Sequence, residues 1–267
     1  MYINRTKSLT TTLLAVFSLV LVFTSCIDDS TPPVMPPVES LEMDFSHFQQ
    51  EKSTEILLEN WLYSLTTVSV FNIYASATLA IPTAAYRIAL EKTPNYESNH
   101  QWLWSFDLPV FGATYTAKLT STTQRKGKVL WEMRVDKQGP DGFTDFLWFE
   151  GEAYLDESVQ WVIYDTPSSP VEVLKTNWIK AEGSNSGSLS YTLVDANHDY
   201  YKSTIESGTM PNETYDRYFN IYRSDLQSNV SIKWSTTDNS GRVKSFKYFE
   251  DEAWHCWNKY LLDDTCY

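Results

Sequence analysis

The stretch KVLWEMRVD at residues 128–136 alternates apolar with polar side chains. Successive side chains of an extended strand point to opposite faces of a sheet. Trp131 and Met133 therefore lie on one face together with the two valines of this stretch, while Glu132 and Arg134 lie on the other face. The stretch predicts a strand with one face packed on a core and the other face turned to solvent.

The sequence after this stretch and the sequence before it also predict β-strands. Turn residues (QGPDG) follow at 138–142, and the chain beyond Trp102 is rich in aromatic and β-branched residues, interrupted by turn residues at about every 8 to 15 positions. This pattern is typical of a long antiparallel meander over residues 102–267. Roughly ten strands in one flat sheet would be exposed on both faces, so the sheet must be covered or must curl toward a half-open barrel.

An internal repeat lies within the predicted meander. The nonapeptide FLWFEGEAY at 146–154 recurs as FKYFEDEAW at 246–254, and Asn-Ser-Gly occurs both at 185–187 and at 239–241. Asn and Gly tolerate the positive φ angles that tight hairpins require. We interpret the repeats as repeated hairpins of the scaffold.

Helical sequence precedes the meander. Residues 45–92 carry apolar side chains near a period of 3.6, which predicts a first helix at 53–65 and two more on either side of Pro82, with a break at Ile81. The predicted fold is α+β: N-terminal helices packed on a large curved antiparallel β-meander with hairpin repeats, as a single globular domain over residues 43–267.

The N-terminus has the order of a secretory signal peptide. Arg5 and Lys7 precede an apolar run at 13–23, which is about half the roughly 20 residues of a membrane span, although a retained single-span anchor is the alternative. Removal of residues 1–25 takes away these two cations and no acid, which moves the formal charge from -13 to -15. Such an acidic chain without basic runs excludes nucleic acid and anionic lipid surfaces as expected partners.

The residues around the expected cleavage site carry a resemblance. Phe-Thr-Ser-Cys at 23–26 resembles the lipobox of bacterial lipoproteins in the loose form of the Bacteroidetes, with Phe23 in place of the usual leucine. The resemblance implies triacylation of Cys26, with palmitate among the acyl chains, which anchors a protein without a transmembrane helix. Asp28 and Asp29 resemble the acidic tag of surface-exposed outer-membrane lipoproteins; a periplasm-facing position is the alternative.

The residues after Cys26 predict a tether. Residues 26–42 are polar and contain four prolines, a composition that favours extended polyproline conformation over packing. Asp-Ser-Thr at 29–31 resembles the short site at which Bacteroidetes O-glycosylate exported proteins, and an unmodified linker is the alternative.

Two cysteines remain in the exported chain. Cys256 and Cys266 can be oxidised outside the cytoplasm, and we expect a disulfide between them; free or metal-bound cysteines are the alternative. The chain's four histidines show no metal-ligand spacing, and His255 beside Cys256 would point to the opposite face of a strand. No cofactor and no metal site are therefore expected.

Carboxylates of the repeat are the one candidate for catalysis. Glu150 and Glu152, like Glu250 and Glu252, would each lie about 6 to 7 Å apart on one strand face, which resembles the separation in glycosidases. Solvated strand faces carry such pairs without any catalysis, and calcium binding with Asp251 is a further alternative. The sequence leaves the enzyme question open and favours a non-catalytic role.

Aromatic residues make up 15% of the chain and give the stronger hypothesis. Most must be core, but Trp and Tyr on an exposed concave face could stack on sugars or line an apolar cavity. We therefore predict a membrane-anchored surface lipoprotein that binds a glycan, peptide or apolar ligand; a structural subunit of an outer-membrane complex and a hydrolase that uses the Glu pairs are the alternatives. The candidate ligand-binding residues are Trp148, Trp161, Trp178, Trp234 and Trp254.

Overall fold

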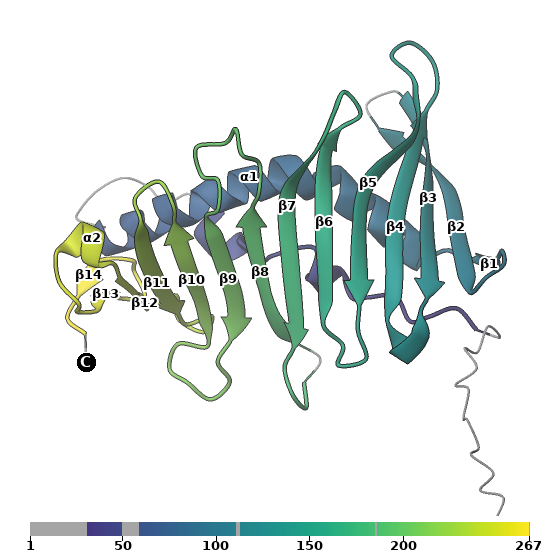
Figure 1. The fold of residues 1–267 in the computed structure, drawn as a ribbon. Coiled ribbons are helices and arrows are strands. Elements are labelled where there is room, and N and C mark those ends of the chain that lie inside the picture. Colours follow the sequence, from purple (N-terminus) through teal and green to yellow (C-terminus); the bar gives the residue numbers. More distant parts are fainter. Residues whose placement is uncertain (1–30, 50–58, 111–112, 185, 267) are drawn as a thin grey trace, which may run out of the picture.

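The structure, a computed structural model, describes residues 31–49, 59–110, 113–184 and 186–266. Its main feature is one sheet in which fourteen antiparallel strands lie side by side in the order of the chain (Figure 1). The strands are β1 (Asn95–Tyr96), β2 (Gln101–Val110), β3 (Ala113–Thr123), β4 (Val129–Lys137), β5 (Phe143–Ala153), β6 (Val159–Thr166), β7 (Ser169–Lys180), β8 (Gly187–Leu193), β9 (Thr204–Thr209), β10 (Arg217–Arg223), β11 (Ser228–Trp234), β12 (Gly241–Lys244), β13 (His255–Trp257) and β14 (Asp263–Asp264).

The sheet is an open meander. In the described part of the chain each strand pairs with its neighbours in sequence, and β1 and β14 form the two edges, so the sheet does not close into a barrel. The predicted α+β class and the antiparallel meander are confirmed. The strand predicted at 128–136 corresponds to β4, and it buries Trp131 and Met133 on one face as expected.

One long helix, α1 (Glu59–Leu90), crosses one face of the sheet (Figure 1). The backbone N–H of Asn60 donates to Asp263 Oδ1 at 3.0 Å, and its side chain donates to the carbonyl of Cys256 at 2.8 Å, which fixes the start of the helix at β13 and β14. Elsewhere α1 contacts β2 and β3, at the opposite end of the sheet. A helix of this length measures about 48 Å, enough to cover most of a sheet whose strands are spaced by about 4.8 Å.

The predicted helix break before Pro82 is wrong, because α1 continues through it as a single helix. Residues 53–58, where we expected a first helix to begin, lie outside the described residues. A proline inside a helix costs about 3 kcal/mol. Pro82 is buried together with Leu79 and Tyr86, and full burial of a large apolar side chain stabilises by about 1.5–3 kcal/mol. Packing on the sheet therefore outweighs the lost hydrogen bond.

The end of the segment predicted as a tether, residues 26–42, packs on the core, with Pro36, Ser40 and Leu41 buried. We call residues 31–49 the N-terminal segment; it contains the short 3-10 helices η1 (Val38–Ser40) and η2 (Ser46–Gln49) and lies on the same face of the sheet as α1. Leu41 and Phe48 are buried there among the strand side chains. Of the buried apolar residues of the N-terminal segment, Leu41 lies within the predicted tether, whereas Met43, Phe45 and Phe48 lie in the domain predicted from residue 43 on.

Buried polar groups of the sheet fix the position of the N-terminal segment. Trp161 Nε1 of β6 donates to Ser40 Oγ at 2.9 Å, and Thr176 Oγ1 of β7 donates to the Ser40 carbonyl at 3.0 Å. Tyr86 of α1 donates to the Pro36 carbonyl at 2.7 Å. Each of these side chains is buried and would lose its partner if the segment came off the sheet, so the segment is held from both sides.

The two copies of the nonapeptide repeat have different structures. Residues 146–154 belong mainly to β5, whereas residues 246–254 form the short helix α2 (Phe246–Phe249) followed by a turn. A Cβ atom on Gly151 would lie 2.2 Å from Cε3 of Trp161, with which it is paired across the strands, so this pairing requires glycine. The second copy has Asp251 at that position. The nonapeptide repeat is therefore one of sequence and not of hairpin structure, whereas Gly187 and Gly241 of the Asn-Ser-Gly repeat each begin the second strand of a hairpin, β7–β8 and β11–β12.

Candidate functional site

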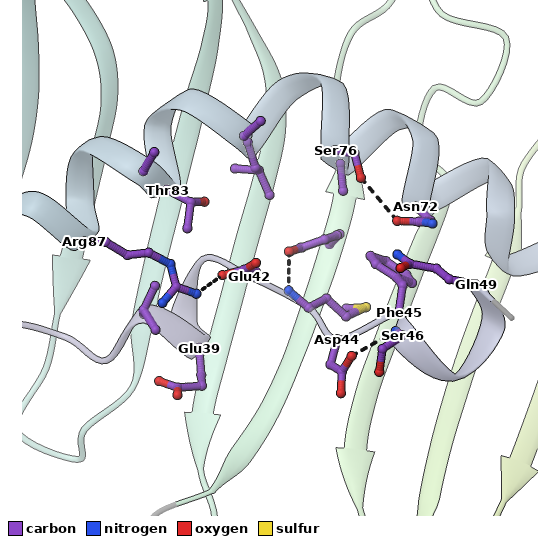
Figure 2. A pocket seen from close by; sticks show the side chains of 17 residues that line it. Glu39, Glu42, Asp44, Phe45, Ser46, Gln49, Asn72, Ser76, Thr83 and Arg87 are labelled. Carbon is purple, nitrogen blue, oxygen red and sulfur yellow. Dashed lines mark hydrogen bonds and ion pairs between the residues drawn. The ribbon is translucent and has the colours of Figure 1, made fainter. Parts of the chain in front are cut away.

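A groove separates α1 from the N-terminal segment (Figure 2). It has a volume of about 620 Å³ and is lined by residues 38–49 on one side, by the turns of α1 from Asn72 to Arg87 on the other, and by Tyr191 of β8. The groove exists because α1 and the segment both pack on the same face of the sheet and run beside one another. We call it the α1 groove.

The floor of the α1 groove is rigid and mostly apolar. Tyr191 is 1% exposed, and its hydroxyl donates to the Leu41 carbonyl at 2.8 Å while it accepts from the Met43 N–H at 2.7 Å. Burial raises the pKa of Tyr191 well above its ordinary range, so the hydroxyl stays neutral and keeps both bonds. Phe45 and Leu79 complete the floor, and both are buried.

Charged and amide side chains form the rim. Arg87 of α1 pairs with Glu42 of the N-terminal segment across the groove, and both side chains are about half exposed. Asp44 Oδ1 accepts from the Ser46 N–H at 2.9 Å, and Glu39 lies farther along the same wall (Figure 2). Of the described residues that line the groove, three are acidic and only Arg87 is basic.

Thr83 is the exceptional residue of the groove. Its side chain points from α1 into the groove beside the pair of Arg87 and Glu42 (Figure 2), the residue is 6% exposed, and Oγ1 has no hydrogen-bond partner among the described residues. Buried hydroxyls are nearly always paired, because an unpaired one costs about 1–3 kcal/mol. Thr66, by contrast, donates to the Leu62 carbonyl at 2.9 Å in the manner usual for a helix.

The five tryptophans predicted to bind ligand do not form one exposed surface. Trp161 and Trp234 are at most 4% exposed and belong to the core, so their prediction as exposed stacking residues is wrong. Trp178 is also 4% exposed, but it lines a pocket of about 590 Å³ together with Pro36 and Val159, which is the second role predicted for these aromatic residues. Trp148 and Trp254 are partly buried, and the guanidinium of Arg242 lies 4.4 Å from the centre of the Trp254 ring. The alternation of apolar and polar residues predicts strands at these positions, but it does not predict which face of the sheet the helix covers.

The carboxylates of the first repeat copy are held by neighbouring side chains. Glu150 accepts from the Tyr164 hydroxyl at 2.6 Å, and Glu152 accepts from Lys128 Nζ at 2.5 Å and also from Tyr154. The hydrogen bond from Lys128 lowers the pKa of Glu152, with a further contribution from Tyr154. A glycosidase acid requires a raised pKa, so this carboxylate is unsuited to that task.

The second copy is arranged differently. Glu250 ends α2 with a φ of 63°, and Glu252 pairs with Lys244 Nζ at 2.7 Å. Asp251 accepts from the His255 ring at 3.0 Å, and this contact lowers the pKa of Asp251. Within the described part of the chain, no three His, Cys, Asp or Glu side chains gather in a way that could hold a metal ion. The acids of the second repeat copy, which were the candidates for calcium binding, therefore do not form such a group.

The remaining site predictions concern cysteines. Cys256 and Cys266 have their sulfurs 2.11 Å apart and are joined as a disulfide that closes the C-terminal turn. Cys26, the predicted lipidation site, lies outside the described residues. A shallow hollow of about 450 Å³ lies over β8 to β11 and is lined by residues that include Thr204 and Asn229.

Helix α1 is long and apolar enough to cross a membrane by length and composition alone, with a mean hydropathy of 1.3 over its best 18-residue window. Core helices of soluble proteins pass the same test, and here α1 packs on the sheet.

Sequence reasoning missed Thr83 and Arg87 as site residues. No local signal could have identified them, because Arg87 pairs with Glu42, 45 positions away in a segment that reads as a linker, and the burial of Thr83 without a partner depends on the fold.

No protein-family model matches this chain, and comparison with curated proteins and with solved structures found no similar protein.

Proposed function

We propose that the chain is a non-catalytic binding module that holds its ligand in the α1 groove. The observation that carries the proposal is the buried, unpaired hydroxyl of Thr83 in a groove with an apolar floor and a polar rim. A small number of polar groups that converge on an apolar surface is the usual composition of a ligand site. A ligand that bonds to this hydroxyl would recover the cost of leaving it unpaired.

Thr83 Oγ1 is closed to water in the free protein, so the ligand must first displace what covers it. Arg87 lies one helical turn beyond Thr83, and Figure 2 shows its pair with Glu42 beside the threonine. An exposed ion pair contributes only about 0–1 kcal/mol. Opening this pair is therefore an inexpensive step that a ligand can drive.

A thermal-shift screen with glycans, peptides and apolar ligands tests the proposal. We expect a ligand that raises the melting temperature of the wild type to raise that of Thr83→Val much less, and to raise that of the control Thr66→Val as in the wild type. Thr66 is a suitable control because its hydroxyl is already bonded within the helix. An equal shift in Thr83→Val, or silence across the whole panel, would contradict the proposal.

We also propose that the module is a lipoprotein of the outer membrane, anchored through Cys26 and exposed on the cell surface. Support comes from the lipobox resemblance and from the acidic residues behind it. The ten residues from Cys26 to the buried Pro36 reach at most about 35 Å, which would keep the groove close to the membrane. Mass spectrometry of the mature N-terminus tests this. An unmodified start elsewhere, or a Cys26→Ser protein that still fractionates with membranes, would refute it.

A second candidate function is that of a subunit that packs on an outer-membrane partner. It is favoured by the outer side of α1, where Leu62 is 52% exposed and Ile73 is 70% exposed, and by the absence of any charged residue between Glu59 and Arg87. Cross-linking of whole envelopes followed by isolation of the chain would recover one fixed partner. The Ile73→Lys variant would then lose that partner, and a retained partner would argue against this surface.

A further inference from the structure

The chemistry of the α1 groove narrows its ligand to one class. The choice of ligand class rests on the proposed function. It follows from the charge, the length and the hydrogen-bonding capacity of the groove. Its N-terminal wall carries Glu39, Glu42 and Asp44, and Arg87 is the one basic side chain among the described residues that line it. An anionic ligand would meet three carboxylates, whereas a cationic ligand would meet a complementary wall.

The pair of Arg87 and Glu42 indicates how a cation binds there. The Arg87 guanidinium reaches across the groove from α1 and occupies one carboxylate of the wall (Figure 2). Because both side chains are about half exposed, a cation supplied by a ligand can exchange with Arg87 at little cost. Glu39 and Asp44 provide two further carboxylates on the same wall.

The length of the groove suits an extended chain. The helical wall from Asn72 to Arg87 measures about 22 Å at 1.5 Å per residue, which matches about seven residues of extended peptide. The floor at Leu79 and Phe45 is apolar and can receive aliphatic side-chain stems, while the charged ends of long side chains reach the rim.

Thr83 supplies an observation that does not depend on charge. Its unpaired hydroxyl can donate to a carbonyl or accept from an N–H, and a peptide backbone offers both groups along its length. We infer that the α1 groove binds an extended basic peptide segment, whose lysine or arginine side chains pair with Glu39, Glu42 and Asp44 and whose backbone bonds to Thr83.

Titration of the purified chain with a labelled peptide of alternating lysine and alanine, about seven residues long, tests the inference. We expect saturable binding that weakens with added salt. The double variant Glu39→Gln with Asp44→Asn should weaken binding about five- to tenfold, and Thr83→Val should do so by a similar factor. The matched control is Glu97→Gln with Glu182→Gln, which changes the net charge equally at exposed positions outside the groove and should change affinity less than about twofold.

Three comparison ligands separate the possible outcomes. In one outcome the control variant weakens peptide binding as much as the groove variant does, or spermine binds as tightly as the peptide. Either result would mean that the ligand is attracted to an acidic protein in general, and it would overturn the inference. Binding of a glutamate–alanine peptide or of a neutral oligosaccharide in a Thr83-dependent manner, without binding of the basic peptide, would refute the ligand class and leave the proposed function standing. If none of these ligands binds, and no compound of the thermal-shift screen raises the melting temperature, both the ligand class and the proposed function are refuted.

Discussion

Replacement of Tyr191 by phenylalanine should destabilise the protein strongly, although it removes a single oxygen atom. The Tyr191 hydroxyl serves the Leu41 carbonyl and the Met43 N–H, and all three groups are buried between the sheet and the N-terminal segment. Each backbone group left without a partner costs about 1–3 kcal/mol. We expect Tyr191→Phe to lose about 2–4 kcal/mol of unfolding free energy, which corresponds to a drop of about 4–16 °C in melting temperature for a domain of this size.

Urea unfolding followed by tryptophan fluorescence measures this loss. The control is Tyr222→Phe on the opposite, exposed face of the sheet, which should change the free energy of unfolding by less than about 0.5 kcal/mol. A Tyr191→Phe protein within about 0.5 kcal/mol of the wild type would mean that the N-terminal segment is not held to β8 by these bonds.

Three further changes test other parts of the structure. Reduction of the C-terminal disulfide, which spans 10 residues, should cost about 2–3 kcal/mol by the loop-entropy estimate and is measured by urea unfolding with and without reductant. Gly151→Ala places a methyl group 2.2 Å from the Trp161 ring and should cost about 1–3 kcal/mol; an unchanged midpoint would contradict the packing described. The hydrogen bond from Arg223 lowers the pKa of Asp225 below its ordinary value of 3.8, so the unfolded chain takes up this proton first as the pH falls. The stabilisation by Asp225 is therefore present above about pH 4 and lost below it, and Asp225→Asn should show a smaller loss of unfolding free energy between about pH 5 and 2 than the wild type.

The fold class could be predicted because β4 alternates between apolar and polar residues, and its buried positions alternate with partly buried ones as that pattern implies. The continuity of α1 could not, since the helix passes through Pro82 only with support from the sheet beneath it. The same holds for the N-terminal segment, whose four prolines indicate a linker while Ser40 and Leu41 are buried against β6 to β8. In both cases contacts between residues far apart in sequence outweigh local preference.

The candidate site was harder to predict than the fold. Aromatic content directed attention to tryptophans such as Trp161, which the structure uses to fill the core. In the α1 groove, Thr83 and Arg87 of α1 face carboxylates of a segment about forty positions away. A threonine in a helix is usually bonded to the preceding turn, whereas Thr83 in the folded protein is not.

The free energy of unfolding of Thr83→Val shows whether the α1 groove keeps a buried hydroxyl unpaired for a ligand. Valine has nearly the shape of threonine and no polar group to bury. We expect Thr83→Val to be more stable than the wild type by about 1 kcal/mol in the absence of ligand. A loss of stability of similar size would show that the hydroxyl is already bonded in the free protein, and would contradict the claim.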